Sequence, residues 1–178
     1  PLLWFSPEKR GILEFSEFHL SRSLEKFLRH YAGDFEVTVD MAFAQVVREC
    51  SKQPRPGQDG TWILPSMVKS YINFHKAGYA HSIEVWHERQ LVGGIYGVFI
   101  KGVFSGESMF YKSSNASKLA LFHLVQLLKS WGLEWMDIQM VTPVTKSFGG
   151  KYLEREDFLQ KLKRTQDENE NSVFAWPC

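Results

Sequence analysis

The spacing of apolar and polar positions along the chain predicts a succession of helices and strands. Apolar residues recur every three or four positions in some segments and every second position in others, which is typical of helices and strands respectively. The expected helices span residues 21–30, 40–47, 65–78, 116–131 and 155–165. The expected strands span residues 35–39, 81–86, 91–100, 103–111 and 135–140, and a further short strand is expected within residues 1–20.

Residue types at the ends of several segments support these assignments. Ser21 and Asp40 are typical of helix N-caps, and Pro65 suits the first turn of a helix. Residues 51–60 hold two prolines and two glycines and therefore predict a loop. Residues 165–172 are polar throughout, and we expect them to form solvated coil.

The order of the later elements indicates the fold class. Three expected strands are joined by short turns at His87–Gln90 and Lys101–Gly102, which predicts an antiparallel meander. The helix over 116–131 is apolar on nearly all sides and precedes one more strand. This order is the one found in N-acetyltransferase-like (GNAT) domains. We therefore expect an α/β (α+β) fold whose mixed, mainly antiparallel sheet is flanked by helices.

Composition limits the size of the domain and its partners. The chain has 178 residues, 44% of them hydrophobic and 15% aromatic, enough for one well-packed domain with at most a small appendage. The formal charge of +1 means that any nucleic-acid surface is a local patch.

Cys50 and Cys178 are too far apart in sequence to suggest a disulfide framework or a zinc site, which favours a reducing cytoplasm. No segment is apolar over the length of a membrane span, so no membrane partner is expected. Because the first residue is Pro1, we expect the chain to start inside a longer gene product.

Glu107, in the third strand of the expected meander, is a candidate functional residue. Strand alternation places Glu107 and Met109 on the same face. If that face is apolar, an ionised carboxylate there costs several kcal/mol unless it meets a cation. The other interpretation is an outward-facing glutamate beside a bulge at Gly106, and the sequence leaves both open.

Three further features of the sequence each have a structural and a functional interpretation. Asp137 and Gln139 share a strand face, where they would bind a ligand or belong to an internal hydrogen-bond network. Three glycines within Gly93–Gly97 indicate a bulge or a close approach of backbone or ligand. Trp62 follows the long loop and is more typical of a core or loop anchor than of a base-stacking platform.

Several motifs in order closely resemble the leucyl/phenylalanyl-tRNA–protein transferases. They are Gly60–Ile63, His81–Trp86, Leu91–Gly97, Gly106–Phe110 and Ala116–Lys118. The resemblance implies transfer of Leu or Phe, with Met as a further candidate, from aminoacyl-tRNA to the N-terminal α-amine of proteins that begin with Arg or Lys, which marks them for degradation. It implies no cofactor and no metal. It also implies that residues 10–178 form the N-acetyltransferase-like catalytic domain and that residues 1–9 are the remnant of a small N-terminal domain.

The resemblance also assigns residues to roles. The pocket for the aminoacyl side chain is expected to be lined by Ile95, Phe104, Met109, Leu121, Leu124 and Leu128. Trp62 is expected to stack on the terminal adenosine of the tRNA, and the helix stripe formed by Arg22, Lys26 and Arg29 to contact the tRNA phosphates. Three residues are expected at the reacting centre. Gln139 positions the attacking amine, and Asp137 polarises Gln139 or relays a proton. Glu107 holds an ammonium group.

One departure from the family pattern leaves room for alternatives. Val144 stands where the family commonly has a histidine, which favours a non-catalytic tRNA- or peptide-binding remnant. That alternative ranks last because Glu107, Asp137 and Gln139 are all present. An acyl-CoA N-acetyltransferase would need a glycine-rich turn at the helix entry, and residues 112–118 contain no glycine.

Overall fold

The computed structural model describes residues 5–53 and 63–177, and one sheet and its flanking helices make up the described part of the chain. The strands are β1 (Lys9–Glu14), β2 (Glu36–Val39), β3 (Ala80–His87), β4 (Gln90–Ile100), β5 (Val103–Tyr111), β6 (Trp135–Gln139) and β7 (Lys151–Glu154). The helices are α1 (Arg22–Tyr31), α2 (Phe43–Lys52), α3 (Pro65–Lys76), α4 (Ala116–Ser130), α5 (Pro143–Ser147), α6 (Arg155–Glu168) and the short 3-10 helix η1 (Ala32–Asp34).

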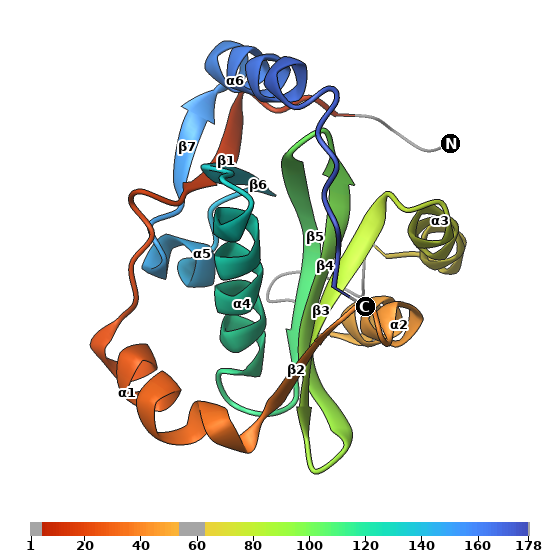
Figure 1. Cartoon of the computed structure of the whole chain (residues 1–178), viewed down its shortest axis with the longest axis vertical. Coiled ribbons are helices and arrows are strands. Elements are labelled where there is room, and N and C mark those ends of the chain that lie inside the picture. The colour runs from red at the N-terminus through yellow and green to blue at the C-terminus, as the bar shows by residue number, and fades with distance from the viewer. Residues whose placement is uncertain (1–4, 54–62, 178) are drawn as a thin grey trace.

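The sheet has the order β2-β3-β4-β5-β6-β1-β7 and confirms the expected fold class. Strands β3, β4 and β5 form the antiparallel meander, and β5 pairs in parallel with β6 across the connecting helix α4. The other neighbouring strands pair antiparallel. Figure 1 shows α4 on one face of the sheet and α2 and α3 on the opposite face. The result is a mixed, mainly antiparallel sheet flanked by helices.

Two hydrophobic clusters lie on the two faces of the sheet. The larger one, here called the α4 cluster, joins α4 to the sheet and includes Phe99, Phe104 and Leu124. The smaller one, here called the α2–α3 cluster, includes Phe43, Tyr96 and Phe110, with Tyr71 packed against it. Because apolar side chains are buried on both faces, the central strands read as continuous apolar runs.

Gly93 permits the close packing of α4 on strand β4. A Cβ atom at Gly93 would lie 2.5 Å from the Cβ of Ala116, the first residue of α4. A Cβ at Gly97 would collide with the carbonyl oxygen of Ser105 and the ring of Phe104. The expected close approach of backbone at Gly93–Gly97 is therefore confirmed.

Some of the expected elements were wrong in detail. The polar segment 165–172 was expected to be coil, but α6 continues to Glu168. Asp40 does not cap α2; its φ is 58°, and the Glu84 carboxylate accepts the N–H groups of Met41 and Ala42 ahead of the helix. Strand β7 and helix α5 were not expected, because each is too short to show a period.

The helices of the described residues include none whose length and apolar character would let it cross a membrane.

Candidate functional site

The three expected site residues Glu107, Asp137 and Gln139 lie together where β5 meets β6. Ser105 of β5 pairs with Asp137 of β6, which places the two strands side by side at this point. Two residues from elsewhere complete the group, Arg10 from β1 and Tyr71 from α3. The group thus combines two carboxylates, one cation, one amide and one phenol.

Asp137 is held by a two-point contact with Arg10. The Arg10 Nε donates to Asp137 Oδ1 at 2.9 Å, and Nη2 donates to Oδ2 at 2.8 Å. The Asp137 side chain is only 3% exposed and that of Arg10 27% exposed. The Arg10 guanidinium also lies 5.5 Å from the ring centre of Phe158. A buried carboxylate that a guanidinium contacts at both oxygens is fixed in orientation.

Asp137 contacts Gln139 through the main chain. Gln139 has a φ of 62°, in the left-handed region that non-glycine residues rarely adopt. Its backbone N–H donates to Asp137 Oδ1 at 2.8 Å, which holds this turn of the chain at the end of β6. Its side-chain Nε2 points elsewhere, toward Glu107 Oε2 at 3.0 Å and the Gly106 carbonyl at 3.1 Å. Asp137 therefore fixes the position of Gln139, while the side-chain amide of Gln139 bonds to Glu107.

Glu107 accepts two hydrogen bonds on the same oxygen. Tyr71 donates its hydroxyl to Glu107 Oε2 at 2.9 Å, beside the bond from Gln139 Nε2. Burial raises the pKa of the Glu107 carboxyl above its usual value, and the nearby Asp137 charge adds to this effect. The hydrogen bonds from Tyr71 and Gln139 and the Arg10 charge oppose it. Burial, together with the Glu107 charge, raises the pKa of Tyr71 in turn.

A bulge in β5 sets the direction of Glu107. Tyr96 pairs with Ser108 and Gly97 with Gly106, so Glu107 is the extra residue on β5. Met109 packs in the α4 cluster, whereas Glu107 bonds to Tyr71 of the α2–α3 cluster. The expectation that Glu107 and Met109 share a face was therefore wrong, because strict alternation does not continue through a bulge.

Arg10 and Tyr71 were missed by the sequence analysis. The Arg10–Asp137 contact joins residues 127 positions apart, and the Tyr71–Glu107 contact joins residues 36 positions apart. One signal was available. A buried aspartate in an apolar strand needs a cation, and Arg10 lies in β1 next to the buried residues Ile12 and Leu13.

The expected pocket residues all belong to the α4 cluster. Met109 is partly buried at the edge of the cluster, and the other five are at most 5% exposed. These residues are Ile95, Phe104, Leu121, Leu124 and Leu128. They come from β4, β5 and α4, so the structure brings together side chains that are far apart in the sequence. Trp62 lies outside the described residues.

The basic stripe lies on the exposed face of α1. Arg22, Lys26 and Arg29 are all exposed, while Leu24 on the same helix is buried. Ser21 accepts the N–H of Leu24 and caps the helix, as expected. The stripe is thus a solvated cationic surface that an anionic partner can reach.

Val144 contributes packing and lies in a short helix. Helix α5 begins with a capping box formed by Thr142 and Thr145. The Val144 side chain is partly buried against the α4 cluster. At this position a valine extends the hydrophobic core.

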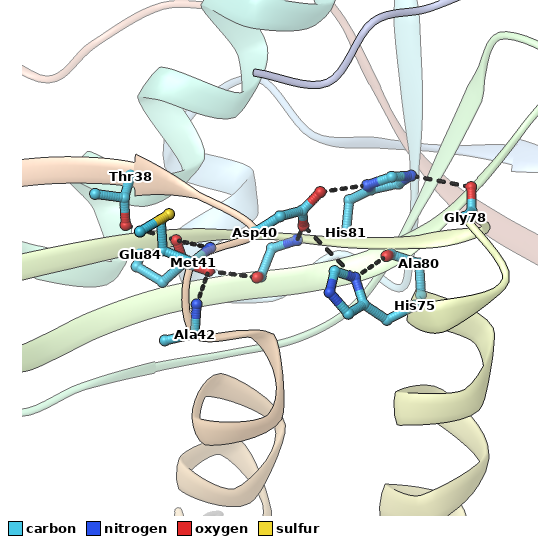
Figure 2. A network of polar contacts seen from close by, with 10 residues as sticks. Thr38, Asp40, Met41, Ala42, His75, Gly78, Ala80, His81 and Glu84 are labelled. Carbon is cyan, nitrogen blue, oxygen red and sulfur yellow. Dashed lines mark hydrogen bonds and ion pairs between the residues drawn. The ribbon is translucent and has the colours of Figure 1, made fainter. Parts of the chain in front are cut away.

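Among the described residues, one group of side chains has the composition of a metal site. Asp40, His75 and His81 lie close together in Figure 2, and their possible ligand atoms are within 4.8 Å of one another. Hydrogen bonds already account for these atoms: His81 Nδ1 lies 2.6 Å from Asp40 Oδ2 and His81 Nε2 lies 3.2 Å from the Gly78 carbonyl. The Nδ1 of His75 lies 2.8 Å from the Ala80 carbonyl. A divalent cation would have to displace His75 from that carbonyl, so the geometry fits a hydrogen-bond network better.

Comparison with known proteins identifies the family. Residues 12–163 match the family model for leucyl/phenylalanyl-tRNA protein transferase. The chain is 46% identical over 169 residues to the leucyl/phenylalanyl-tRNA–protein transferase of Oleidesulfovibrio alaskensis, which covers 92% of this chain and 67% of that protein. It is 47% identical over 163 residues to the protein of the same name from Chromobacterium violaceum, which covers 92% of this chain and 69% of that protein.

A solved structure supports the fold alone. The chain is similar to L-PGS from Bacillus licheniformis with a TM-score of 0.54 and 14% sequence identity, over 89% of this chain and 64% of that one. The structural likeness agrees with the mixed sheet, and the sequence matches extend over most of the chain. The chain therefore belongs to the leucyl/phenylalanyl-tRNA protein transferase family.

Proposed function

We propose that this chain transfers Leu or Phe, with Met as a further candidate, from aminoacyl-tRNA to the N-terminal α-amine of proteins. The observation that carries the proposal is the bonded group of Asp137, Gln139 and Glu107 in a member of this family. Residues 10–178 serve as the N-acetyltransferase-like catalytic domain and residues 1–9 as the remnant of a small N-terminal domain. The reaction takes place in the cytoplasm, where it marks acceptors for degradation.

The reaction is the aminolysis of an activated ester. The α-amine attacks the ester carbonyl carbon, a C–N bond forms, the C–O bond to the terminal ribose breaks, and the ribose oxygen takes up the proton that the amine loses. A protein α-amine has a pKa of about 7.7–8.0, so a useful share is neutral near pH 7. The chain therefore has mainly to orient the amine and the ester.

Gln139 is the residue that orients the amine. Its Nε2 is directed at Glu107 and the Gly106 carbonyl, which leaves Oε1 as the amide atom able to accept a hydrogen bond from the attacking amine. Asp137 acts as a positioning residue, because Arg10 and the Gln139 main chain engage its carboxylate oxygens. Of the two roles expected for Asp137, the contacts favour support of Gln139 over proton relay.

Glu107 supports a preference for acceptors that begin with Arg or Lys. Both of its side-chain hydrogen bonds reach Oε2, so Oε1 faces no side-chain donor within the site as described. Burial raises its pKa, and a basic side chain of the acceptor would reverse that shift and keep the carboxylate ionised. The acceptor cation and Glu107 then stabilise each other at a site that Tyr71 and Gln139 hold in place.

The α4 cluster and α1 supply the contacts with aminoacyl-tRNA. The aminoacyl side chain enters among Ile95, Phe104, Met109 and the α4 leucines, where each buried methylene is worth about 0.8 kcal/mol. Leu and Phe are thereby favoured over small side chains. The exposed stripe on α1 contacts tRNA phosphates, and such contacts weaken with added salt.

The test is transfer of labelled leucine from leucyl-tRNA to a peptide beginning with Lys. Gln139→Ala is compared with Gln160→Ala, an exposed glutamine on α6 that serves as the matched control. We expect transfer by the unmodified chain and by the control, and loss of about a hundredfold or more in Gln139→Ala. Full transfer by Gln139→Ala would contradict the assigned site.

A second arm tests the acceptor. A peptide beginning with Glu is expected to be a poor substrate, because Glu107 would repel its side chain. Acetyl-CoA in place of leucyl-tRNA is expected to give no acetylated peptide. Acetylation without leucine transfer would replace this proposal with the acyl-CoA alternative.

A further inference from the structure

The last described residues of the chain pack against the α4 cluster. After α6 the chain runs back along the sheet, as Figure 1 shows, and Trp176 stacks on His81 of β3. Phe174 and Trp176 pack against the α4 cluster, whereas Val173 is 93% exposed. Two aromatic side chains thus attach a segment without regular structure to the core.

Trp176 lies at the centre of an aromatic group. Its ring is stacked on His81 with centroids 3.9 Å apart and an interplanar angle of 4°. It also contacts Trp131 at 5.1 Å, Phe99 at 5.4 Å and Phe104 at 6.1 Å between ring centroids. These partners come from β3, β4, β5 and the C-cap of α4, so Trp176 contacts residues from four parts of the fold.

The ring on which Trp176 stacks is fixed on both sides. Figure 2 shows His81 between the Asp40 carboxylate and the Gly78 carbonyl, at 2.6 Å and 3.2 Å from its two nitrogens. Asp40 is itself held by the backbone N–H of Ser82 at 2.8 Å. Because neither His81 nor Asp40 can turn without losing these bonds, Trp176 has a rigid platform.

The position of Trp176 relates it to the aminoacyl pocket. Phe104, one of the expected pocket residues, lies with its ring centroid 6.1 Å from that of Trp176 and belongs to β5, the strand that also carries Glu107. Leu124 and Leu128 belong to the same cluster as Phe104. The C-terminal segment therefore contacts a residue that is expected to line the aminoacyl pocket.

We infer that Trp176 forms the end wall of the aminoacyl pocket and sets its depth, so that it is a specificity-determining residue. The inference rests on the proposed function. With the indole in place Phe104 cannot move back, and the pocket holds Leu more fully than the longer Phe side chain. Without the indole Phe104 can retreat, and the pocket accepts longer side chains.

Substitution of a residue that only packs in the hydrophobic core would have a different effect from substitution of a residue that forms the end of the pocket. The first substitution would lower stability and reduce transfer of every aminoacyl group by the same factor. Removal of an end wall changes the ratio between a longer and a shorter side chain. The ratio of kcat/KM for Phe over Leu is therefore the quantity that separates the two roles.

The experiment measures transfer in competition between phenylalanyl-tRNA and leucyl-tRNA. The variants are Trp176→Ala and Trp176→Phe, and Val173→Ala is the matched control on the exposed part of the same segment. In Trp176→Ala we expect the Phe-over-Leu ratio to rise by at least roughly fourfold, which corresponds to one additional buried methylene. Trp176→Phe should give a smaller rise and Val173→Ala none.

The possible outcomes separate this inference from the proposed function. If the Trp176 variants fold, as judged by circular dichroism, and the ratio stays within twofold of the unmodified chain, the inference is overturned. If Trp176→Ala does not fold, the ratio in Trp176→Phe decides in the same way. If the unmodified chain transfers neither amino acid, the proposed function fails, and this inference fails with it.

Discussion

Replacement of Arg10 by Met tests whether the buried ion pair organises the site. The change removes the guanidinium but keeps a side chain long enough to pack against Phe158, where Arg10 now lies 5.5 Å from the ring centre. Asp137 would keep one hydrogen bond, from the Gln139 main chain, and lose both bonds from Arg10. A carboxylate that is 3% exposed would then lack its counter-charge.

The expected cost follows from the burial of the pair. Removing one partner of a buried ion pair costs about 3–5 kcal/mol. Because Arg10 is 27% exposed, water can enter part of the vacated space, and we expect the lower end, about 3 kcal/mol. For a chain of this size that is a fall in Tm of about 6–12 °C.

Urea unfolding of Arg10→Met at neutral pH measures this cost. The matched control is Lys9→Met on the same strand, because Lys9 and Glu154 form an ion pair in which both side chains are about 60% exposed. The control is expected to stay within about 0.5 kcal/mol of the unmodified chain. The double variant Arg10→Met with Asp137→Asn should regain stability relative to Arg10→Met, since the unpaired charge is gone.

Activity provides the second measurement on Arg10→Met. Without Arg10 the Asp137 carboxylate keeps only its bond to the Gln139 main chain and holds Gln139 less firmly, so kcat for leucine transfer should fall more than KM rises. A stability within 0.5 kcal/mol of the unmodified chain, equal to the Lys9→Met control, would refute the argument that Asp137 depends on Arg10.

Three further predictions concern charge and close packing. Burial raises the pKa of Glu107. The kcat/KM for a Lys-initiated peptide should therefore decline, as pH falls through that raised value, more steeply than protonation of the attacking amine alone requires, and Glu107→Gln should show only the decline that is due to the amine. Hydrogen bonds from Lys151 and Lys161 lower the pKa of Glu14 in the folded chain. The stability that the ionised Glu14 carboxylate contributes is therefore fully present above its pKa in the unfolded chain, and it is lost as pH falls through its lower pKa in the folded chain. Unfolding of Glu14→Gln should accordingly depend less on pH in the acid range. Gly93→Ala should lower the free energy of unfolding by about 1–3 kcal/mol, because the new Cβ would collide with Ala116. Gly33→Ala, where a Cβ has open space around it, should leave thermal stability unchanged or raise it slightly.

The central part of the fold could be predicted from the sequence because its signals are local. The strands expected over 81–86, 91–100 and 103–111 are observed as Ala80–His87, Gln90–Ile100 and Val103–Tyr111. Each is a long apolar run, and the turns between them contain residues with positive φ, such as Lys101 and Gly102. Long runs bounded by turn residues leave little ambiguity about where a strand begins and ends.

The outer elements could not be predicted because their stability comes from distant partners. Strand β7 has four residues and alternates between partly buried and exposed positions. Within residues 5–53 and 63–177 its one partner strand is β1, which lies far away in sequence. Helix α6 continues through a polar segment whose Thr165 accepts a hydrogen bond from Trp135 of β6. Neither contact leaves a periodic pattern in the segment that makes it.

The site itself lies where the regular pattern is broken, and this explains which parts of it were predictable. Residue types identified Glu107, Asp137 and Gln139, but their directions depend on a bulge in β5, a register shift between Gly11 and Ile12 of β1, and the positive φ of Gln139. Each irregularity redirects a polar group that strict alternation would send to the other face or leave without a partner. Such distortions cost free energy and persist when surrounding contacts hold them, as Arg10 and Asp137 do here. Polar residues within an apolar strand therefore locate a site from sequence, whereas the orientation of their side chains follows from long-range contacts that only the fold creates.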